Sequence, residues 1–189
     1  GTCLYLLDEL LLKPKQPGYR VSGKHKAINV LLLFLIGMPL SNYLLHVPMD
    51  VPPADLSGRT FLVTGCTENS IGYAVAEWLA TWNGTVVCGM RSLERGAKAK
   101  ALIERQVAAA KSTGTITIEQ VDLASFASTR AFAATVLKKH PKLHGVILNA
   151  GFMPLATAQG EPHVSSDGWE MAYQVNHLSQ YLLTRLLEP

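Results

Sequence analysis

The chain carries a strand–turn–helix pattern whose turn could hold the phosphates of a dinucleotide. Residues 62–80 read LVTGCTENSIGYAVAEWLA, with Gly65 in the turn and Gly72 at the start of the helix. A bound phosphate needs backbone N–H groups that point at it and the positive end of a helix behind it. The usual G-x-G-x-x-G pattern has a middle glycine, which Asn69 or Ser70 replaces here, and the turn is one residue longer. Because Ser70 can still cap the helix and donate its hydroxyl, we expect an altered phosphate turn; a strand–turn–helix without a ligand is the alternative.

Three further features follow later strands. Arg91 stands after the second expected strand, where an acid would bind the ribose 2′-hydroxyl of NAD; an arginine there suits the 2′-phosphate of NADP. Asp122 ends the third strand. The small residues Asn149, Ala150 and Gly151 end the fourth, where they would let the backbone approach a flat cofactor. Each feature has a plainer interpretation: a surface arginine, a helix-start acid, a turn. At successive strand ends they predict one nucleotide pocket.

The elements that must position these residues follow a regular alternation. From Arg59 onward, short apolar runs alternate with longer amphipathic ones. We expect strands at 60–65, 85–90, 115–123 and 143–151, and helices at 70–84, 93–110, 125–139 and from Asp167 to the end. Gly84 should end the first helix as a left-handed cap, and Asp167 should cap the last. The alternation predicts an α/β, Rossmann-like parallel sheet of about four strands in the order 3-2-1-4, with helices on both faces.

Length and composition predict about one domain with an apolar appendage. The 189 residues are 48% hydrophobic and 16% charged, and the net charge of +3 is too small and too scattered to predict a nucleic-acid partner. Cys66 and Cys88 are expected to be buried reduced thiols, which indicates a reducing compartment. No metal is expected, because the chain has no C-x-x-C and Pro141 keeps His140 and His144 off a shared helix.

Residues 27–47 form an apolar run, AINVLLLFLIGMPLSNYLLHV, that predicts a transmembrane or re-entrant helix. The run holds no Lys, Arg, Asp or Glu over 21 residues, and a helix of that length matches a hydrocarbon core roughly 30 Å thick. Residues 1–26 form a basic segment that suits a membrane anchor. Pro39 would kink or split the helix, and a buried core helix is the alternative. Residues 48–58 are interpreted as a linker and residues 59–189 as a partial NAD(P)-binding domain, so we expect a membrane-associated protein in contact with lipid, in an organelle that the sequence does not specify.

The domain resembles the short-chain dehydrogenase/reductase family over about residues 55–188. TGCTENSIG is similar to the family's TGxxxGxG turn, VDLASF to its adenine-binding acid, and LNAG to its NNAG motif, with Leu148 in place of the first Asn. DGWEMAYQVNHLSQYLLTRLL resembles a helix of the retinol dehydrogenase, WW-domain oxidoreductase and protochlorophyllide reductase branches, with Ser179 and Gln180 in place of Gly-His. An amino-terminal membrane segment also occurs in the retinol dehydrogenase-like branch.

This resemblance implies an NADP site and a role for each matching residue. Arg91 would select NADP, Asp122 with Leu123 would bracket the adenine, and the residues after the fourth strand would lie along the cofactor. The implied cofactor-binding residues are Thr64, Gly65, Ser70, Ile71, Gly72, Arg91, Asp122, Leu123, Asn149, Ala150 and Gly151. Asn176 matches the family's active-site asparagine.

The family's catalytic serine and Tyr-x-x-x-Lys pair have no counterpart in this sequence. In the family the tyrosine passes a proton while NAD(P) moves a hydride. Tyr181 is followed four residues later by Arg185, a spacing we interpret as accidental. We therefore expect a catalytically incomplete half-domain, with NADP retained or lost, that serves as an accessory or structural subunit among other subunits of a membrane complex. The alternative is the amino-terminal part of an active, membrane-anchored NADP-dependent oxidoreductase that acts on a hydrophobic carbonyl or alcohol.

Overall fold

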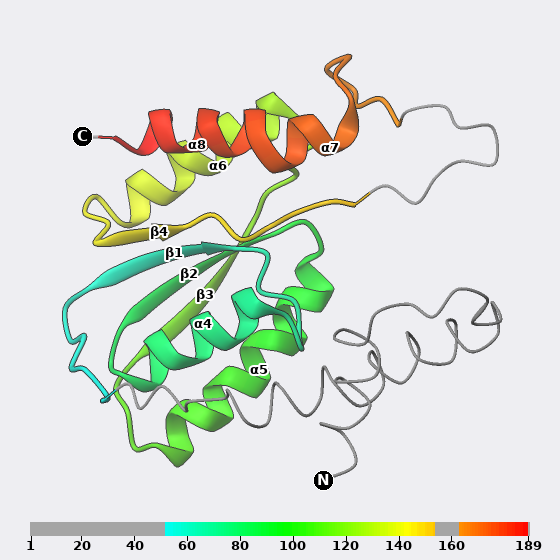
Figure 1. The fold of residues 1–189 in the computed structure, drawn as a ribbon. Coiled ribbons are helices and arrows are strands. Elements are labelled where there is room, and N and C mark those ends of the chain that lie inside the picture. Colours follow the sequence, from blue (N-terminus) through cyan, green and yellow to red (C-terminus); the bar gives the residue numbers. More distant parts are fainter. Residues whose placement is uncertain (1–51, 154–162, 189) are drawn as a thin grey trace, which may run out of the picture. The chain divides into compact units, whose positions relative to one another are not determined.

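Four parallel strands form the centre of the structure, a computed structural model that describes residues 52–153 and 163–188 (Figure 1). The strands are β1 (Thr60–Thr64), β2 (Thr85–Met90), β3 (Thr115–Gln120) and β4 (Gly145–Ile147). β1 pairs with β2 on one side and β4 on the other, and β3 pairs with the far side of β2. The observed order, β3-β2-β1-β4, confirms the predicted α/β sheet.

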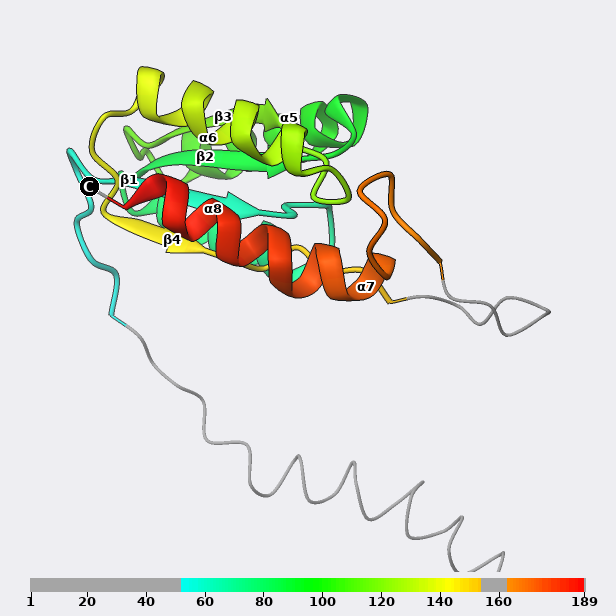
Figure 2. The same cartoon turned by 90° about the horizontal axis from the view of Figure 1, so that it is seen from above.

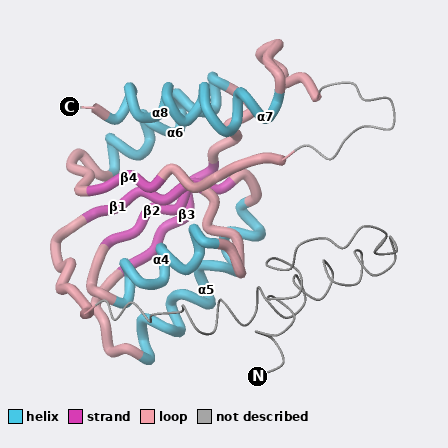
Figure 3. Tube along the Cα trace, in the orientation of Figure 1, coloured by secondary structure: helices cyan, strands magenta, loops and turns pink. Residues whose placement is uncertain are grey.

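Helices cover both faces of this sheet (Figures 1 and 2). On one face lie α4 (Ile71–Thr81) and α5 (Leu93–Ala109), and on the other lie α6 (Phe126–Lys139) and α8 (Ser179–Leu187). Figure 3 shows the strand–helix alternation from β1 to β4 along the chain. Because the strands are parallel, each connection runs from the carboxyl end of one strand back to the amino end of the next. The carboxyl ends of all four strands therefore lie together at one edge of the sheet, and the amino ends lie at the opposite edge.

Two hydrophobic clusters hold the layers together, one on each face. Leu62 and Val63 are neighbours in β1, fully buried, and belong to different clusters, because successive side chains of a strand point to opposite faces. In β2 every residue from Val86 to Met90 is buried, as expected for a central strand covered on both sides. The face of α4 that meets the sheet consists of Gly72, Ala76 and Ala80, whose small size allows close packing.

The first helix ends differently from the sequence-based prediction. Asn83, with φ 69°, takes the left-handed conformation, and Gly84 does not. The Asn83 side chain explains the choice, because its Oδ1 accepts from Ser112 Oγ and from the Thr113 N–H, both at 3.0 Å. Gly84 is needed for space instead: a Cβ there would lie 2.7 Å from the Leu79 carbonyl oxygen. The prediction of Gly84 as the left-handed cap is therefore wrong.

The last helix also begins later than predicted. It consists of α7 (Met171–Tyr173), the π-helical turn η2 (Gln174–Leu178) and α8 without a break. Its cap is Glu170, whose carboxylate accepts from the N–H groups of Ala172 and Tyr173 at 2.9 and 2.7 Å. These bonds lower the pKa of Glu170. The predicted cap, Asp167, instead accepts from the Phe126 N–H at 2.7 Å and thereby joins this segment to the start of α6.

The expected membrane segment at 27–47, the basic residues 1–26 and the start of the linker lie outside the described residues. Within the described ranges, 52–153 and 163–188, the structure contains no helix that combines the length and the apolar character needed to cross a bilayer. β3 and β4 are shorter than predicted, since β3 ends at Gln120 and β4 at Ile147. The predicted site residues Asp122 and Asn149 therefore stand in the loops just after these strands.

Candidate cofactor-binding site

The turn between β1 and α4 has the shape of a phosphate-binding turn although its glycine pattern is altered. Gly65 has φ 77° and Asn69 has φ 62°, so both take the left-handed conformation. Asn69 thus stands where glycine would be the usual choice, and asparagine tolerates this region better than most residues. Ser70 caps α4: its Oγ accepts from the Tyr73 N–H at 3.1 Å and donates to the Gly65 carbonyl at 3.3 Å. The Ser70 hydroxyl and the Tyr73 N–H are therefore used inside the turn, and the N–H groups of Ile71 and Gly72 at the start of α4 are suited to receive an anion.

Two glycines let this turn pack directly on the end of β4. A Cβ on Gly72 would lie 2.4 Å from Nδ2 of Asn149, and a Cβ on Gly65 would lie 2.9 Å from Cα of Ala150. The Asn149 amide fills the contact, because its Nδ2 donates to the carbonyls of Thr64 and Gly65 at 2.9 and 3.0 Å. Asn149 is thus committed to holding the turn, and its side chain does not line the adjacent pocket.

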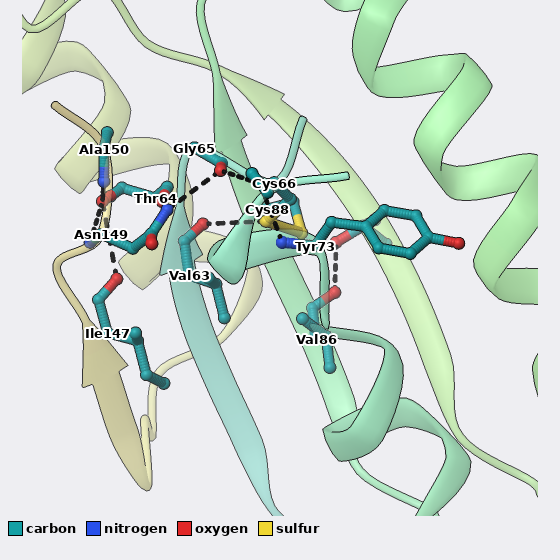
Figure 4. The surroundings of a disulfide bond; sticks show 12 residues. Val63, Thr64, Gly65, Cys66, Tyr73, Val86, Cys88, Ile147, Asn149 and Ala150 are labelled. Atoms are coloured by element: carbon teal, nitrogen blue, oxygen red, sulfur yellow. Dashed lines mark hydrogen bonds between the residues drawn. A yellow bond between two sulfur atoms is a disulfide. The ribbon is translucent and has the colours of Figure 1, made fainter. Parts of the chain in front are cut away.

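Thr64 joins β1 to the segment after β4 from beneath the turn (Figure 4). The residue is fully buried, and its Oγ1 accepts from the N–H groups of Asn149 and Ala150, both at 3.0 Å. Oγ1 is also 3.5 Å from the Ile147 carbonyl, to which it donates. Thr64 therefore fixes the position of residues that line the pocket without facing the pocket itself.

A disulfide bond joins Cys66, just after β1, to Cys88 in β2 (Figure 4). Both residues are fully buried, their Cα atoms are 6.1 Å apart, and both belong to the cluster on the α4 face. The pairing follows from the parallel register, in which Val63 of β1 lies opposite Cys88 and Cys66 stands just beyond. The prediction of reduced thiols is wrong for this pair, and the inference of a reducing compartment loses its basis.

Tyr73 follows the turn on the first stretch of α4 and packs against the same cluster. Burial, and then the nearby carboxylates of Glu77 and Glu68, raise the pKa of Tyr73 above its ordinary value. The phenol therefore stays neutral at physiological pH, and its role is in packing.

A pocket of about 280 Å³ opens at the carboxyl edge of the sheet. Its lining is drawn from all four strand ends and from the final helix: Gly65, Thr67, Gly89, Met90, Arg91, Ser92, Arg95, Val121, Asp122, Leu123, Ala150, Gly151, Phe152, Met171 and Val175. Arg91 and Arg95 are both exposed, and both line the pocket, so they bring two cations to it. A pair of guanidinium groups beside a phosphate turn is suited to a second phosphate group.

Asp122 and Leu123 line the pocket mainly through a tightly held loop. Asp122 accepts from the Ala124 N–H at 3.0 Å, and its own N–H donates to Ser128 Oγ at 2.9 Å. Leu123 is buried, and its carbonyl accepts from Ser179 Oγ at 2.6 Å. The loop is therefore anchored on α6 and α8, which holds Asp122 and Leu123 in the lining of the pocket.

Asn176 lies in the π-helical turn, and both the oxygen and the nitrogen of its side-chain amide form hydrogen bonds with the backbone of Phe152. Its Oδ1 accepts from the Phe152 N–H at 2.7 Å, and its Nδ2 donates to the Phe152 carbonyl at 2.8 Å. Phe152 in turn lines the pocket. In this structure Asn176 positions the segment that follows Gly151.

Comparison with known proteins agrees with this geometry. The model of the short chain dehydrogenase family matches residues 59–189. The chain belongs to this family. The resemblance inferred from the turn, the VDL and LNAG segments and the final helix is thus confirmed.

Among curated relatives, a short-chain dehydrogenase/reductase of Aspergillus flavipes is 41% identical over 145 residues, which cover 76% of this chain and 40% of the relative. Retinol dehydrogenase 14 of Homo sapiens is 33% identical over 144 residues, which cover 71% of this chain and 41% of the relative. The chain therefore spans about 40% of the length of these relatives.

Among solved structures, a metagenomic short-chain oxidoreductase in complex with NADP has a TM-score of 0.56 and 29% identity, over 70% of this chain and 56% of that chain. The RhlG/NADP active-site complex of Pseudomonas aeruginosa has a TM-score of 0.58 and 26% identity, over 72% of this chain and 50% of that chain. Both of these neighbouring structures contain NADP.

The structure brings most of the sequence-predicted residues to one edge but gives them different positions. Those that line the pocket are Gly65, Arg91, Asp122, Leu123, Ala150 and Gly151. Those that stand behind it or beside it are Thr64, Ser70, Ile71, Gly72, Asn149 and Asn176. Ile71 is 78% exposed beside the turn, outside the pocket lining.

Sequence reasoning missed Arg95, Thr67 and Phe152. The signal for Arg95 was available, because it stands in the first turn of the predicted helix that follows Arg91 directly. No comparable signal pointed to Phe152, whose position depends on Asn176 from a distant helix.

Proposed function

We propose that this chain is the NADP-binding part of a membrane-attached oxidoreductase of the short-chain dehydrogenase family, and that the whole protein acts on a hydrophobic carbonyl or alcohol. The observation that carries the cofactor is the pocket in which Arg91 and Arg95 stand beside the Gly65 turn. NADPH would supply the hydride for the reduction of a carbonyl, and NADP+ would accept the hydride in the oxidation of an alcohol.

The residues of the pocket fit this cofactor. The Gly65 turn and the start of α4 would hold the phosphates, the two arginines would bind the 2′-phosphate, and Asp122 would face the adenosine end. The small residues Ala150 and Gly151 leave room along the remaining wall. No acid follows β2 to repel a 2′-phosphate, since Arg91 and Ser92 occupy that position.

Membrane attachment is proposed from the apolar run at 27–47, which is long enough to span a hydrocarbon core. Attachment would keep a hydrophobic substrate close to the enzyme, and one relative is named as a retinol dehydrogenase. Extraction of membranes with alkaline carbonate tests the attachment, because an inserted chain stays with the pellet.

A second candidate is an accessory subunit of a membrane complex that reuses the fold. It is favoured by the altered glycine turn, in which Asn69 and Ser70 stand where the usual pattern has a glycine. Purification of the protein from its native membrane separates the two. NADPH-dependent carbonyl reduction by the purified protein supports the oxidoreductase, and a stable complex without bound nucleotide or reductase activity supports the accessory subunit.

Equilibrium binding of NADPH and NADH to the full chain tests the cofactor assignment. Arg91→Glu should weaken NADPH binding by at least about tenfold, because a charge-assisted contact contributes about 1.5–3 kcal/mol. NADH lacks the 2′-phosphate, so its affinity should change far less. Arg105→Glu makes the same change of charge farther along α5, outside the pocket lining, and serves as the control. Equal losses for the two nucleotides, or equal losses in the two variants, would contradict the assignment.

A further inference from the structure

Four loops lie side by side at the amino edge of the sheet, opposite the nucleotide pocket and at the left in Figure 1. Each precedes one strand, and they comprise residues 55–59, 82–84, 110–114 and 140–144. Backbone hydrogen bonds of 2.7, 2.9 and 3.0 Å join the row: from His144 to Thr60, from Thr85 to Arg59 and from Thr115 to Gly84. The loops therefore form one continuous surface.

This surface carries exposed cations on three of its four loops, namely Arg59, Lys111 and Lys142. Within these loops the one acid is Asp55, whose carboxylate already accepts from Ser57 and from the Asn83 amide. A surface with an excess of exposed cations attracts an anionic partner. Anionic lipid headgroups are one such partner, because they attract nearby lysines and arginines.

Two tryptophans lie beside the cations, at the end of α4. Trp78 is 59% exposed and stacks on Trp82, with ring centroids 6.3 Å apart. The Trp82 carbonyl accepts from the Leu56 N–H at 2.7 Å, so the pair marks the place where the chain enters the domain. Tryptophan favours the boundary between membrane and water, because its ring is apolar and its N–H needs a hydrogen-bond partner.

The connection to the apolar run limits how far this surface can lie from a bilayer. Eight residues, 48–55, separate the run from Leu56, and an extended chain covers at most about 3.6 Å per residue, or roughly 29 Å. A folded unit of this size has a radius of gyration of about 14 Å. A tether of this length allows the edge to which it is joined to reach a bilayer.

We propose that Arg59, Lys111, Lys142, Trp78 and Trp82 form an amino-edge surface that docks on an anionic lipid bilayer. The inference rests on the membrane attachment under the proposed function and adds the face that the domain turns toward the lipid. In this orientation the nucleotide pocket, at the other end of the strands, opens to the aqueous phase. NADP then enters and leaves without crossing the headgroup layer.

The tryptophans themselves provide the test, because the third one, Trp169, lies at the pocket end of the domain, just before α7. The full chain is reconstituted into vesicles of phosphatidylcholine and phosphatidylserine that contain a brominated phosphatidylcholine, which quenches tryptophan fluorescence on contact. Trp169→Phe leaves the α4 pair as reporters, and the double variant Trp78→Phe, Trp82→Phe leaves Trp169. We expect the pair to be quenched at least twofold more strongly than Trp169.

Charge reversal tests the lipid specificity in the Trp169→Phe background. Lys111→Glu with Lys142→Glu should lower the docked-to-undocked ratio by at least about 25-fold, on the basis of roughly fivefold per cation. Lys98→Glu with Arg130→Glu, in the halves of α5 and α6 nearest the pocket edge, carries the same charge change and should have little effect. On vesicles of phosphatidylcholine without phosphatidylserine, the Trp169→Phe protein with Lys111 and Lys142 intact should be quenched as weakly as the Lys111/Lys142 variant is on the anionic vesicles.

The outcomes separate the two proposals. A chain that sediments with the vesicles but shows equal quenching of both reporters, or equal effects of both charge reversals, overturns the amino-edge surface and leaves the membrane attachment standing. A chain that carbonate extracts and that does not sediment with vesicles overturns both.

Discussion

The Thr64 hydroxyl should contribute more to stability than its size suggests, and Thr64→Val isolates that contribution. Valine has nearly the same shape, so the substitution opens no cavity in the fully buried site. It removes the acceptor of the N–H groups of Asn149 and Ala150, each 3.0 Å from Oγ1. A buried donor left without a partner costs about 1–3 kcal/mol, and these two residues are half-buried. The free energy of unfolding should therefore fall by about 2–4 kcal/mol.

Urea unfolding of the chain at neutral pH measures this loss. With a slope of about 2 kcal/mol per molar, the midpoint should fall by about 1–2 M without a change of slope. Thr64→Ser keeps the hydroxyl and should recover most of the loss. Thr60→Val, at the other end of β1, is the matched control, because the Thr60 side chain makes no hydrogen bond to a described residue. If Thr64→Val and Thr60→Val lose the same free energy, the hydroxyl does not hold the strand ends together and the argument fails.

Three further perturbations test other contacts. Gly72→Ala should destabilise the fold by about 1–3 kcal/mol in urea although alanine favours helices, because its Cβ would lie 2.4 Å from Nδ2 of Asn149; an unchanged midpoint would contradict that packing. Glu170→Gln should lower the melting temperature more at pH 7 than near pH 3. The pKa of Glu170 is lowered in the folded state, so its stabilisation is present above the ordinary carboxyl pKa and is lost as the pH falls through the folded value; an equal effect at both pH values would refute the cap. Alkylation in denaturant without reductant should leave Cys66 and Cys88 unlabelled in mass spectra, and reduction should cost about 3 kcal/mol for a sequence separation of 22 residues; labelling of the unfolded, unreduced chain would rule out the bridge.

The sheet could be predicted because the local sequence of each strand is enough to recognise it. β1 and β2 are short apolar runs bounded by glycine, serine or arginine, and each is followed by a helix with small or apolar residues at helical spacing. Parallel pairing follows from that alternation, and the strand order is the usual one of a doubly wound sheet. The prediction that Arg91 and Asp122 lie at the carboxyl edge depends only on locating the ends of β2 and β3 correctly.

The two capping errors share one physical cause, which is that the hydrogen-bond partner lies far along the chain. Asn83 takes the left-handed position because of Ser112 and Thr113, about thirty residues away. Asp167 is drawn from its own helix to the start of α6 by the Phe126 N–H, 41 residues away in sequence. Local propensity ranks glycine and a nearby acid first at such positions, and it contains no information about a distant donor.

The altered turn shows how the two kinds of information combine. The extra residue and the lost glycine suggest a weakened phosphate site when the pattern alone is considered. In the structure, Asn69 supplies the left-handed step and Ser70 closes the turn on the Gly65 carbonyl, so the amino end of α4 still faces the carboxyl edge. Asn149 then occupies the space that Gly72 leaves free. Because Thr64 and Asn149 brace the turn from beneath, the lining of the pocket depends on contacts between β1 and the segment after β4 as much as on the glycine pattern.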